Sequence, residues 1–273
     1  MKQYIRFQNA KTLRVIQLLV GYWVICAGTA SGQGYHLGLQ LTPNMSFSDP
    51  RELTHHTDGA LAHFGYGFIF DAMFTESYAI GTGVNIFYTG GSSVYFESAV
   101  DPEGMMIEKI RLEGRWQYVE IPLTFKMRTK QIGYTTYHGQ FGVGLGLNVR
   151  AEGMRSVEGQ SALDSLGVPG VLVPILEPTG NQVSLADQTR LFRPSMIVGL
   201  GLERSLLEST ALLCGIRYNM ALRNQYEDFP ILQSHTPDDL LLQFDESSGV
   251  NLPVEKQMLG KTGQIELCVG LMF

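Results

Sequence analysis

The last ten residues of the chain carry a large apolar side chain at every second position and end on an aromatic residue. One face of an extended strand here carries Ile265, Leu267, Val269, Leu271 and Phe273, and the other carries Gln264, Glu266, Cys268, Gly270 and Met272. Successive side chains of a β-strand point to opposite faces, so the pattern predicts a strand with one apolar face. About ten residues are also what a tilted strand needs to cross a lipid bilayer.

Seven earlier segments repeat this period, and no segment shows a convincing helical period. They cover residues 35–47, 61–74, 78–88, 110–126, 134–150, 192–204 and 210–223. The clearest is 134–150, where Phe141, Val143 and Leu145 alternate with glycines. Pro122 lies inside the fourth segment and cannot donate a ladder hydrogen bond, so we expect a bulge or a broken pairing there.

The polar face of these segments decides what the apolar face meets. Glycine is frequent, 31 of 273 residues, against a usual share of about 7%. A soluble ligand-binding barrel such as a lipocalin is the alternative with eight alternating strands. Its outer face would be rich in Lys and Glu, whereas here the polar face is mainly glycine. Glycine suits the interior of a narrow barrel, so we expect the apolar face to contact lipid.

The connections between these segments alternate in length. Residues 75–77, 127–133 and 205–209 are short turns, whereas 48–60, 89–109, 151–191 and 224–262 are long. This alternation is typical of an outer-membrane barrel with short periplasmic turns and long extracellular loops. We therefore predict an all-β fold, an eight-stranded antiparallel transmembrane up-and-down β-barrel. Loops 151–191 and 224–262 are expected either to fold over the mouth, to extend as hairpins, or to be partly disordered.

The amino-terminal residues indicate the compartment. Basic residues come first, an apolar run follows at 15–27, and small residues follow at 28–32. That layout is typical of a secretory signal peptide, with an uncleaved anchor as the alternative. We predict a cleaved signal peptide at 1–32, a barrel domain at 33–273, and location in the outer membrane. The likeness of the tail to terminal strands of outer-membrane barrels implies that Phe273 belongs to the signal read by the barrel-insertion machinery.

Charged side chains on the polar faces are expected to point into the lumen. They are Asp71, Glu120, Lys126, Arg150, Glu203, Arg217 and Glu266. Lone buried charges are costly, so these groups should pair. Arg217 is the expected hub, because Glu203 and Glu266 lie on the flanking strands. The network either plugs the barrel and fixes its register or forms a gated path for ions or protons.

Few residues indicate chemistry. Cys214 and Cys268 fall on opposite faces of their strands, so we expect two free thiols. His36, His63 and His138 face the lumen without a serine partner. His55 and His56 lie near Asp49 and Asp58, where solvated side chains are favoured over a metal site. The net charge of −6 argues against nucleic acid. We predict no enzyme activity, catalytic residue, metal or cofactor.

One segment resembles a known family. Residues 118–126 read Tyr-Val-Glu-Ile-Pro-Leu-Thr-Phe-Lys, which is similar to the Y-x-E-I-P-L-x-x-K strand of the PorT-type outer-membrane β-barrel proteins of Bacteroidetes. Residues 139–146, 216–219 and the tail resemble further strands of that family. The resemblance implies an eight-stranded outer-membrane barrel. The family's namesake belongs to the machinery of type IX secretion and gliding.

Three functions therefore remain open. The first is a structural or binding barrel whose long outer loops contact an envelope protein or a surface ligand. The second is a component of a secretion or transport assembly of the type IX kind. The third is a lipid A-modifying barrel enzyme. A wide diffusion pore is disfavoured, because side chains fill the interior of an eight-stranded barrel.

Overall fold

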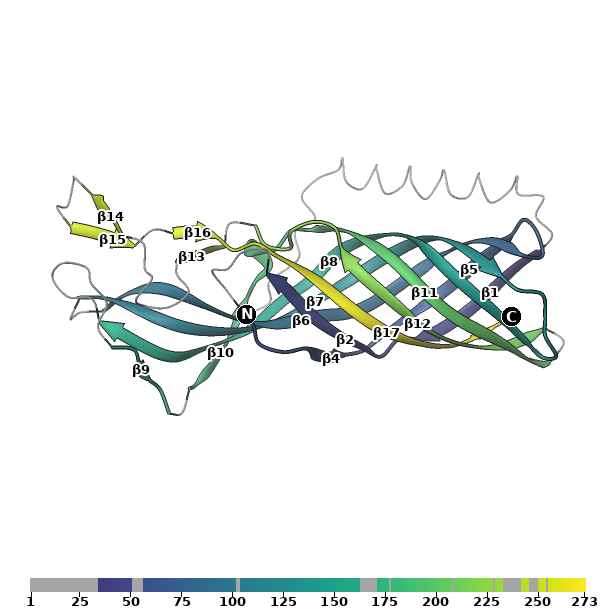
Figure 1. The fold of residues 1–273 in the computed structure, drawn as a ribbon, viewed down its shortest axis with the longest axis horizontal. Coiled ribbons are helices and arrows are strands. Elements are labelled where there is room, and N and C mark those ends of the chain that lie inside the picture. The colour runs from purple at the N-terminus through teal and green to yellow at the C-terminus, as the bar shows by residue number, and fades with distance from the viewer. Residues whose placement is uncertain are drawn as a thin grey trace, which may run out of the picture.

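The computed structural model is an all-β barrel that continues into a sheet at one end (Figure 1). It describes residues 34–50, 56–101, 104–162, 171–176, 178–207, 209–227, 229–232, 242–245, 250–253 and 255–273. The predicted signal peptide, Cys26, His55 and His235 lie outside the described residues. Within the described ranges, no helix combines the length and hydropathy needed to cross a membrane.

Eight strands form the closed ring, and every neighbouring pair is antiparallel. In ring order they are β1 (Gly34–Leu41), β5 (Gly65–Met73), β6 (Tyr78–Asp101), β7 (Gly104–Arg128), β8 (Thr135–Ala162), β11 (Phe192–Leu207), β12 (Thr210–Ala221) and β17 (Gly260–Met272). Pairing of β1 with β17, from Gly38 opposite Met272 to Leu41 opposite Val269, closes the ring. The predicted eight-stranded antiparallel barrel is therefore confirmed.

The remaining elements are short and lie toward one end. They are β2 (Asn44–Pro50), β3 (His56–Thr57), β4 (Leu61–His63), β9 (Val173–Pro174), β10 (Gly180–Ser184), the 3₁₀ turn η1 (Ala186–Gln188), β13 (Pro230–Leu232), β14 (Leu242–Asp245), β15 (Val250–Pro253) and β16 (Glu255–Gln257). β9 and β10 pair with β8, and β3 pairs with β6. β13 pairs with β16 and β14 with β15, as two small hairpins.

Proline residues interrupt the ladder at two places. The first predicted strand, 35–47, is divided into β1 and β2 at Thr42–Pro43, although Pro43 still accepts a hydrogen bond from Leu267 N at 2.9 Å. β6 and β7 pair at Thr82 opposite Leu123 and again from Asn85 opposite Glu120, so pairing is lost opposite Pro122. The expected broken pairing at Pro122 is confirmed, since proline lacks the donor.

Three strands are much longer than the membrane crossing requires. β6, β7 and β8 have 24, 25 and 28 residues, against about ten for a tilted crossing. They continue past the barrel as a twisted sheet at the end far from the carboxyl terminus (Figure 1). The prediction of a loop at 89–109 is therefore wrong, because β6 and β7 stay paired out to Asp101 and Gly104. The predicted loop 151–191 likewise begins with strand, up to Ala162.

The barrel exterior is apolar where it would meet lipid. Exposed side chains on the ring strands include Leu39, Phe68, Val84, Ile121, Leu123, Val143, Leu145, Leu147, Val198, Leu200, Ile216, Ile265 and Leu267. Near the short turns, the rings of Phe74, Tyr78 and Phe125 pack on one another with centroids 5.7–6.2 Å apart. Such an apolar band with aromatic residues at its border is typical of a barrel in a membrane.

Candidate functional sites: the filled lumen and the outer sheet

The lumen holds six of the seven charged residues that the sequence places there. Asp71, Glu120, Lys126, Glu203, Arg217 and Glu266 are all buried. They lie on β5, β7, β11, β12 and β17. Along each of these strands, the residues directly before and after the charged residue face the outside of the barrel. Strand alternation alone therefore positions these side chains. The strand register determines which of them meet.

Glu120 is the centre of the largest group. Its carboxylate accepts hydrogen bonds from Ser195 Oγ at 2.7 Å and Asn219 Nδ2 at 3.0 Å, and it lies 3.4 Å from Nη1 of Arg193. The Arg193 guanidinium also lies over the ring of Tyr118, with Cζ 5.4 Å from the centroid. Arg193 is absent from the residues expected in the lumen. The sequence does contain a signal for it, because Arg193 is an even number of residues from Ser195 and Glu203 on β11 and therefore lies on the same face of that strand.

Arg217 pairs with Glu266 but not with Glu203. Nε of Arg217 donates to Oε2 of Glu266 at 2.6 Å, and the two residues are direct cross-strand partners. Glu203 is level with Leu213 instead, four residues along β12 from Arg217, and it binds Arg128. The expectation that Arg217 joins both carboxylates is therefore wrong, because the β11–β12 register separates them.

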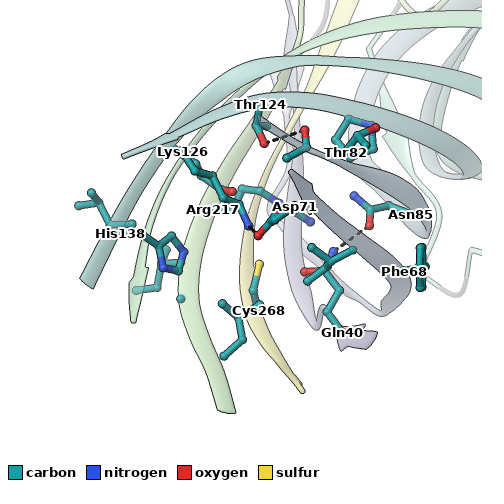
Figure 2. Close-up of a pocket in the computed structure, with 18 residues that line it drawn as sticks. Gln40, Phe68, Asp71, Thr82, Asn85, Thr124, Lys126, His138, Arg217 and Cys268 are labelled. Atoms are coloured by element: carbon teal, nitrogen blue, oxygen red, sulfur yellow. Dashed lines mark hydrogen bonds and ion pairs between the residues drawn. The ribbon is translucent and has the colours of Figure 1, made fainter. Parts of the chain in front are cut away.

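A small cavity lies beside the Asp71–Lys126 pair (Figure 2). Lys126 Nζ donates to Asp71 Oδ2 at 2.6 Å, and across the lumen Gln40 Nε2 donates to Asn85 Oδ1 at 2.8 Å. The cavity holds about 30 Å³, which is room for one or two water molecules. Within the part of the chain that the structure describes, Asp71 Oδ1, Thr82 Oγ1 and Asn85 Nδ2 have no hydrogen-bond partner. Water bound in the cavity would satisfy these atoms.

Arg150 does not lie in the lumen. Gln117 pairs with Arg150 and Tyr118 with Asn148, so Val149 is an extra residue in β8. A bulge of this kind reverses the alternation beyond it. Val149 and Arg150 are consequently both exposed, and the next buried residue is Ala151. Arg150 binds Glu152 on the outer surface, with Nε 2.6 Å from Oε1. The prediction of a lumenal Arg150 is therefore wrong.

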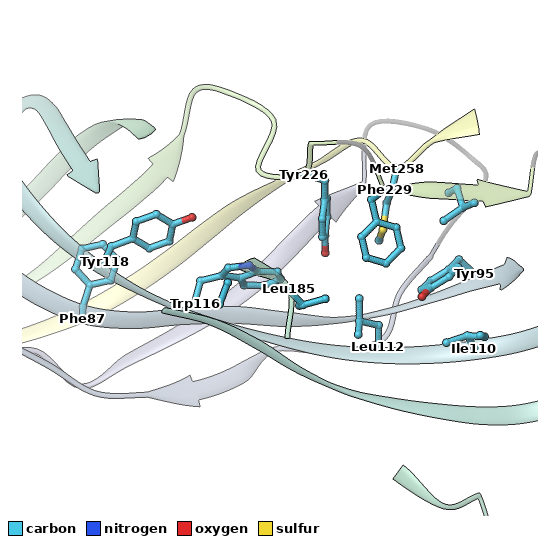
Figure 3. Packing of buried hydrophobic residues seen from close by; sticks show 12 residues of the cluster. Phe87, Tyr95, Ile110, Leu112, Trp116, Tyr118, Leu185, Tyr226, Phe229 and Met258 are labelled. Carbon is cyan, nitrogen blue, oxygen red and sulfur yellow. The ribbon is translucent and has the colours of Figure 1, made fainter. Parts of the chain in front are cut away.

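An apolar cluster closes the barrel end from which the outer sheet extends (Figure 3). It comprises Phe87, Tyr95, Ile110, Leu112, Trp116, Tyr118, Ala151, Leu185, Tyr226, Phe229, Ile231 and Met258. We refer to this group as the mouth cluster. Parts of the two long connections thus fold over the mouth, one of the alternatives expected for them. Trp116 is fully buried, and its Nε1 donates to Thr189 Oγ1 at 3.1 Å.

Ion pairs join the three strands of the outer sheet. Arg155 on β8 binds both Glu97 on β6 and Glu108 on β7, at 3.0 and 3.1 Å. Lys109 Nζ lies 3.0 Å from Glu158, which also binds Arg111. Burial would raise the pKa of Glu158, but hydrogen bonds from these two cations and their charges leave it below its usual value. The pairs hold the sheet together beyond the membrane.

The described residues offer little for catalysis or metal binding. No group of three or more His, Cys, Asp or Glu side chains in these ranges could hold a metal ion. His138 borders the lumen cavity and lies 3.7 Å from Glu203, whereas His36 and His63 are partly buried. Cys214 and Cys268 are free thiols, as predicted.

These features define the class of protein. A closed antiparallel ring satisfies the backbone hydrogen bonds, and its apolar exterior requires lipid rather than water. Short turns face the periplasm in such barrels and longer connections face outside, so the outer sheet projects from the cell. The chain is an integral β-barrel protein of the outer membrane.

Among the comparisons with known proteins, similarity is found to solved structures alone. No protein-family model matches the sequence, and no curated protein matches it. Solved structures similar to it include Neisserial surface protein A, with 11% identity, coverage of 88% of this chain and 96% of that chain, and a TM-score of 0.37. OprG of Pseudomonas aeruginosa has 12% identity, the same coverages and a TM-score of 0.38. The outer-membrane protease OmpT of Escherichia coli has 9% identity, coverage of 89% and 97%, and a TM-score of 0.33.

Proposed function

We propose that this protein is a binding barrel whose outer sheet contacts a protein partner at the cell surface. The observation that carries the proposal is the extension of β6, β7 and β8 beyond the membrane as a paired, ion-bridged sheet. If these extensions served only to connect the strands of the barrel, flexible loops would be sufficient. A sheet that stays ordered outside the membrane instead supports a binding role, because it presents fixed side chains to a partner.

The contact surface that fits this role is the segment around β9. Val171, Val173 and Leu176 are 87%, 63% and 95% exposed. Exposed apolar side chains of this kind, grouped on one projecting segment, are typical of protein-interaction sites. The filled lumen supports binding rather than transport, because the mouth cluster and the buried ion pairs occupy its length.

The test is site-specific photo-crosslinking in intact cells. A photoreactive residue at Val173 should give a protein adduct, and one at Gln131 in a short turn serves as the periplasmic control. Replacing Val171, Val173 and Leu176 together by serine should remove the adduct from a probe placed at Met154, an exposed residue of the outer part of β8, while the barrel still inserts. The proposal fails if the probe at Val173 gives no protein adduct, or if the triple variant keeps the Met154 adduct.

The resemblance to the PorT-type family supports a second role, in a secretion assembly. However, the residues that carry this resemblance make their contacts inside the barrel. Glu120, in the Glu-Ile-Pro-Leu segment, is fully buried and bound to Ser195 and Asn219. Pro122 is buried at the broken pairing. The motif therefore relates to how the barrel is built. Co-purification of envelope secretion components with the native protein would support the secretion role, and their absence would count against it.

A further inference from the structure

The outward face of the sheet formed by β6, β7 and β8 changes from apolar to polar and charged over three rows of cross-strand neighbours. Three consecutive rows of cross-strand neighbours, going outward, are Ile86–Val119–Leu147, Tyr88–Gln117–Arg150 and Gly90–Arg115–Glu152. The first row belongs to the lipid-facing band. The second and third rows therefore lie at the level of the lipid headgroups of the outer leaflet.

Arg115 is an exposed cation at this level. Its Cζ lies 4.1 Å from the centroid of the Tyr88 ring, and no ion pair involves it among the residues that the structure describes. A cation on the face of an aromatic ring is held in place without using up its hydrogen-bond donors. The guanidinium therefore keeps its donors available to a ligand from the membrane.

Arg150 is the second cation, and the bulge at Val149 is what turns it outward. Its Nε and Nη2 both lie 2.6 Å from Glu152 Oε1, which fixes the orientation of the side chain. The side chain is still 58% exposed. A guanidinium has five N–H donors, so donors of Arg150 remain free beside those of Arg115.

We propose that Arg115 and Arg150, with Tyr88, bind phosphate on the glycolipid headgroups of the outer leaflet. Guanidinium groups recognise phosphate through paired, charge-assisted hydrogen bonds. The acyl chains of the same lipid would continue over the apolar row of Ile86, Val119 and Leu147, so one molecule contacts both rows. This rim arginine site goes beyond the proposed binding of a protein partner, because it lies on the lipid side of the barrel and not on the outer segment.

Native mass spectrometry of the folded barrel, titrated with lipid in detergent, tests the site. The probes are bisphosphorylated lipid A, the same glycolipid without phosphates, and phosphatidylglycerol. The wild type should bind bisphosphorylated lipid A about tenfold or more tightly than either other lipid. Arg115→Ala/Arg150→Ala should lose that preference. The matched control is Lys130→Ala/Arg204→Ala, two exposed cations at the short-turn end, which should keep it.

Because both arginines are exposed, the variant is expected to fold, and heat-modifiable migration on gels verifies this. Equal binding of phosphorylated and dephosphorylated glycolipid would overturn the proposal, as would an unchanged preference in the double variant. Equally tight binding of phosphatidylglycerol would show that any phosphate suffices and would refute selectivity for the glycolipid. A loss of preference in the control variant would show general attraction to anions in place of a site.

Discussion

Removing one member of the Arg217–Glu266 pair should destabilise the barrel strongly. The two side chains are only 8% and 2% exposed. Arg217→Met would leave the Glu266 carboxylate buried, with Gln264 Nε2 at 2.5 Å as its remaining side-chain donor. Breaking a buried pair in this way costs about 3–5 kcal/mol. The equilibrium constant for unfolding should therefore rise more than about a hundredfold.

The assay is urea unfolding of the barrel in lipid vesicles, followed by fluorescence. Trp116 is the only tryptophan outside the predicted signal peptide, and it is buried in the mouth cluster, so its emission reports loss of structure there. Heat-modifiable migration gives a second readout of the intact barrel. The control is Arg150→Met, which breaks an exposed ion pair and should leave the unfolding midpoint unchanged.

A double variant separates the buried charge from the packing. Arg217→Met/Glu266→Leu removes both charges, and apolar replacements of a buried pair are often neutral or stabilising. Its stability should therefore return toward that of the wild type. The reasoning is refuted if Arg217→Met unfolds at the wild-type urea concentration, or if the double variant shows the sum of two large losses.

Three further changes test other parts of the structure. Leu112→Ala in the mouth cluster should cost about 2–5 kcal/mol, measured by urea unfolding, because it empties a side-chain site that is 1% exposed; a change below about 0.5 kcal/mol would contradict a packed mouth. Gly144→Ala should lower the unfolding midpoint, since the added Cβ would lie about 2.3–2.5 Å from lumen side chains. Gly146→Ala, in which the nearest atom to the added Cβ would be the backbone oxygen of Arg193 at 3.1 Å, should lower it less, and the reverse order would be inconsistent with the packing. The pKa of Glu158 is below its usual value. Its ion pairs therefore stabilise the outer sheet at pH values above that usual pKa, and this stabilisation is lost as the pH falls through the pKa of Glu158 in the folded protein. The protection of β7 and β8 against hydrogen exchange, taken relative to the intrinsic exchange rate at each pH, should therefore fall in acid, and fall less in Glu158→Gln.

The alternation of side chains was sufficient to predict the barrel and its lipid-facing side. Residues such as Leu145 and Leu267 needed only the period of two, together with the small side chains opposite them. The strand register was not accessible in the same way. Whether Glu203 meets Arg217 depends on which residues of β11 and β12 hydrogen-bond, and a shift of four residues leaves the alternation unchanged.

Two other features depended on interactions that no single strand reveals. The bulge at Val149 turns Arg150 outward, although Gly144, Gly146 and Arg150 stand at even spacing in the sequence and would share one face of a regular strand. The outer parts of β6 and β7 contain many polar residues, so their sequence predicts a loop. They form strands because they pair with each other and with β8, and because their inner face packs in the mouth cluster.

Arg193 could have been recognised from the sequence. It precedes Ser195, Gly199 and Glu203 at even spacing, which places it on the lumen face of β11. The predicted strand 192–204 already contains Arg193, but Pro194 beside it interrupts the apolar face, which is regular from Met196 to Leu202. The structure makes Arg193 a central member of the Glu120 group.

The central claim is that side chains fill this membrane barrel, so that its function lies on its outer surface. Single-channel recording in planar lipid bilayers tests that claim most directly. The wild-type protein, with folding verified by heat-modifiable migration, should produce no steady conductance above that of the bare bilayer. A stable, large conductance from the wild type would contradict the account, because the mouth cluster and the buried ion pairs occupy the lumen in the described part of the barrel.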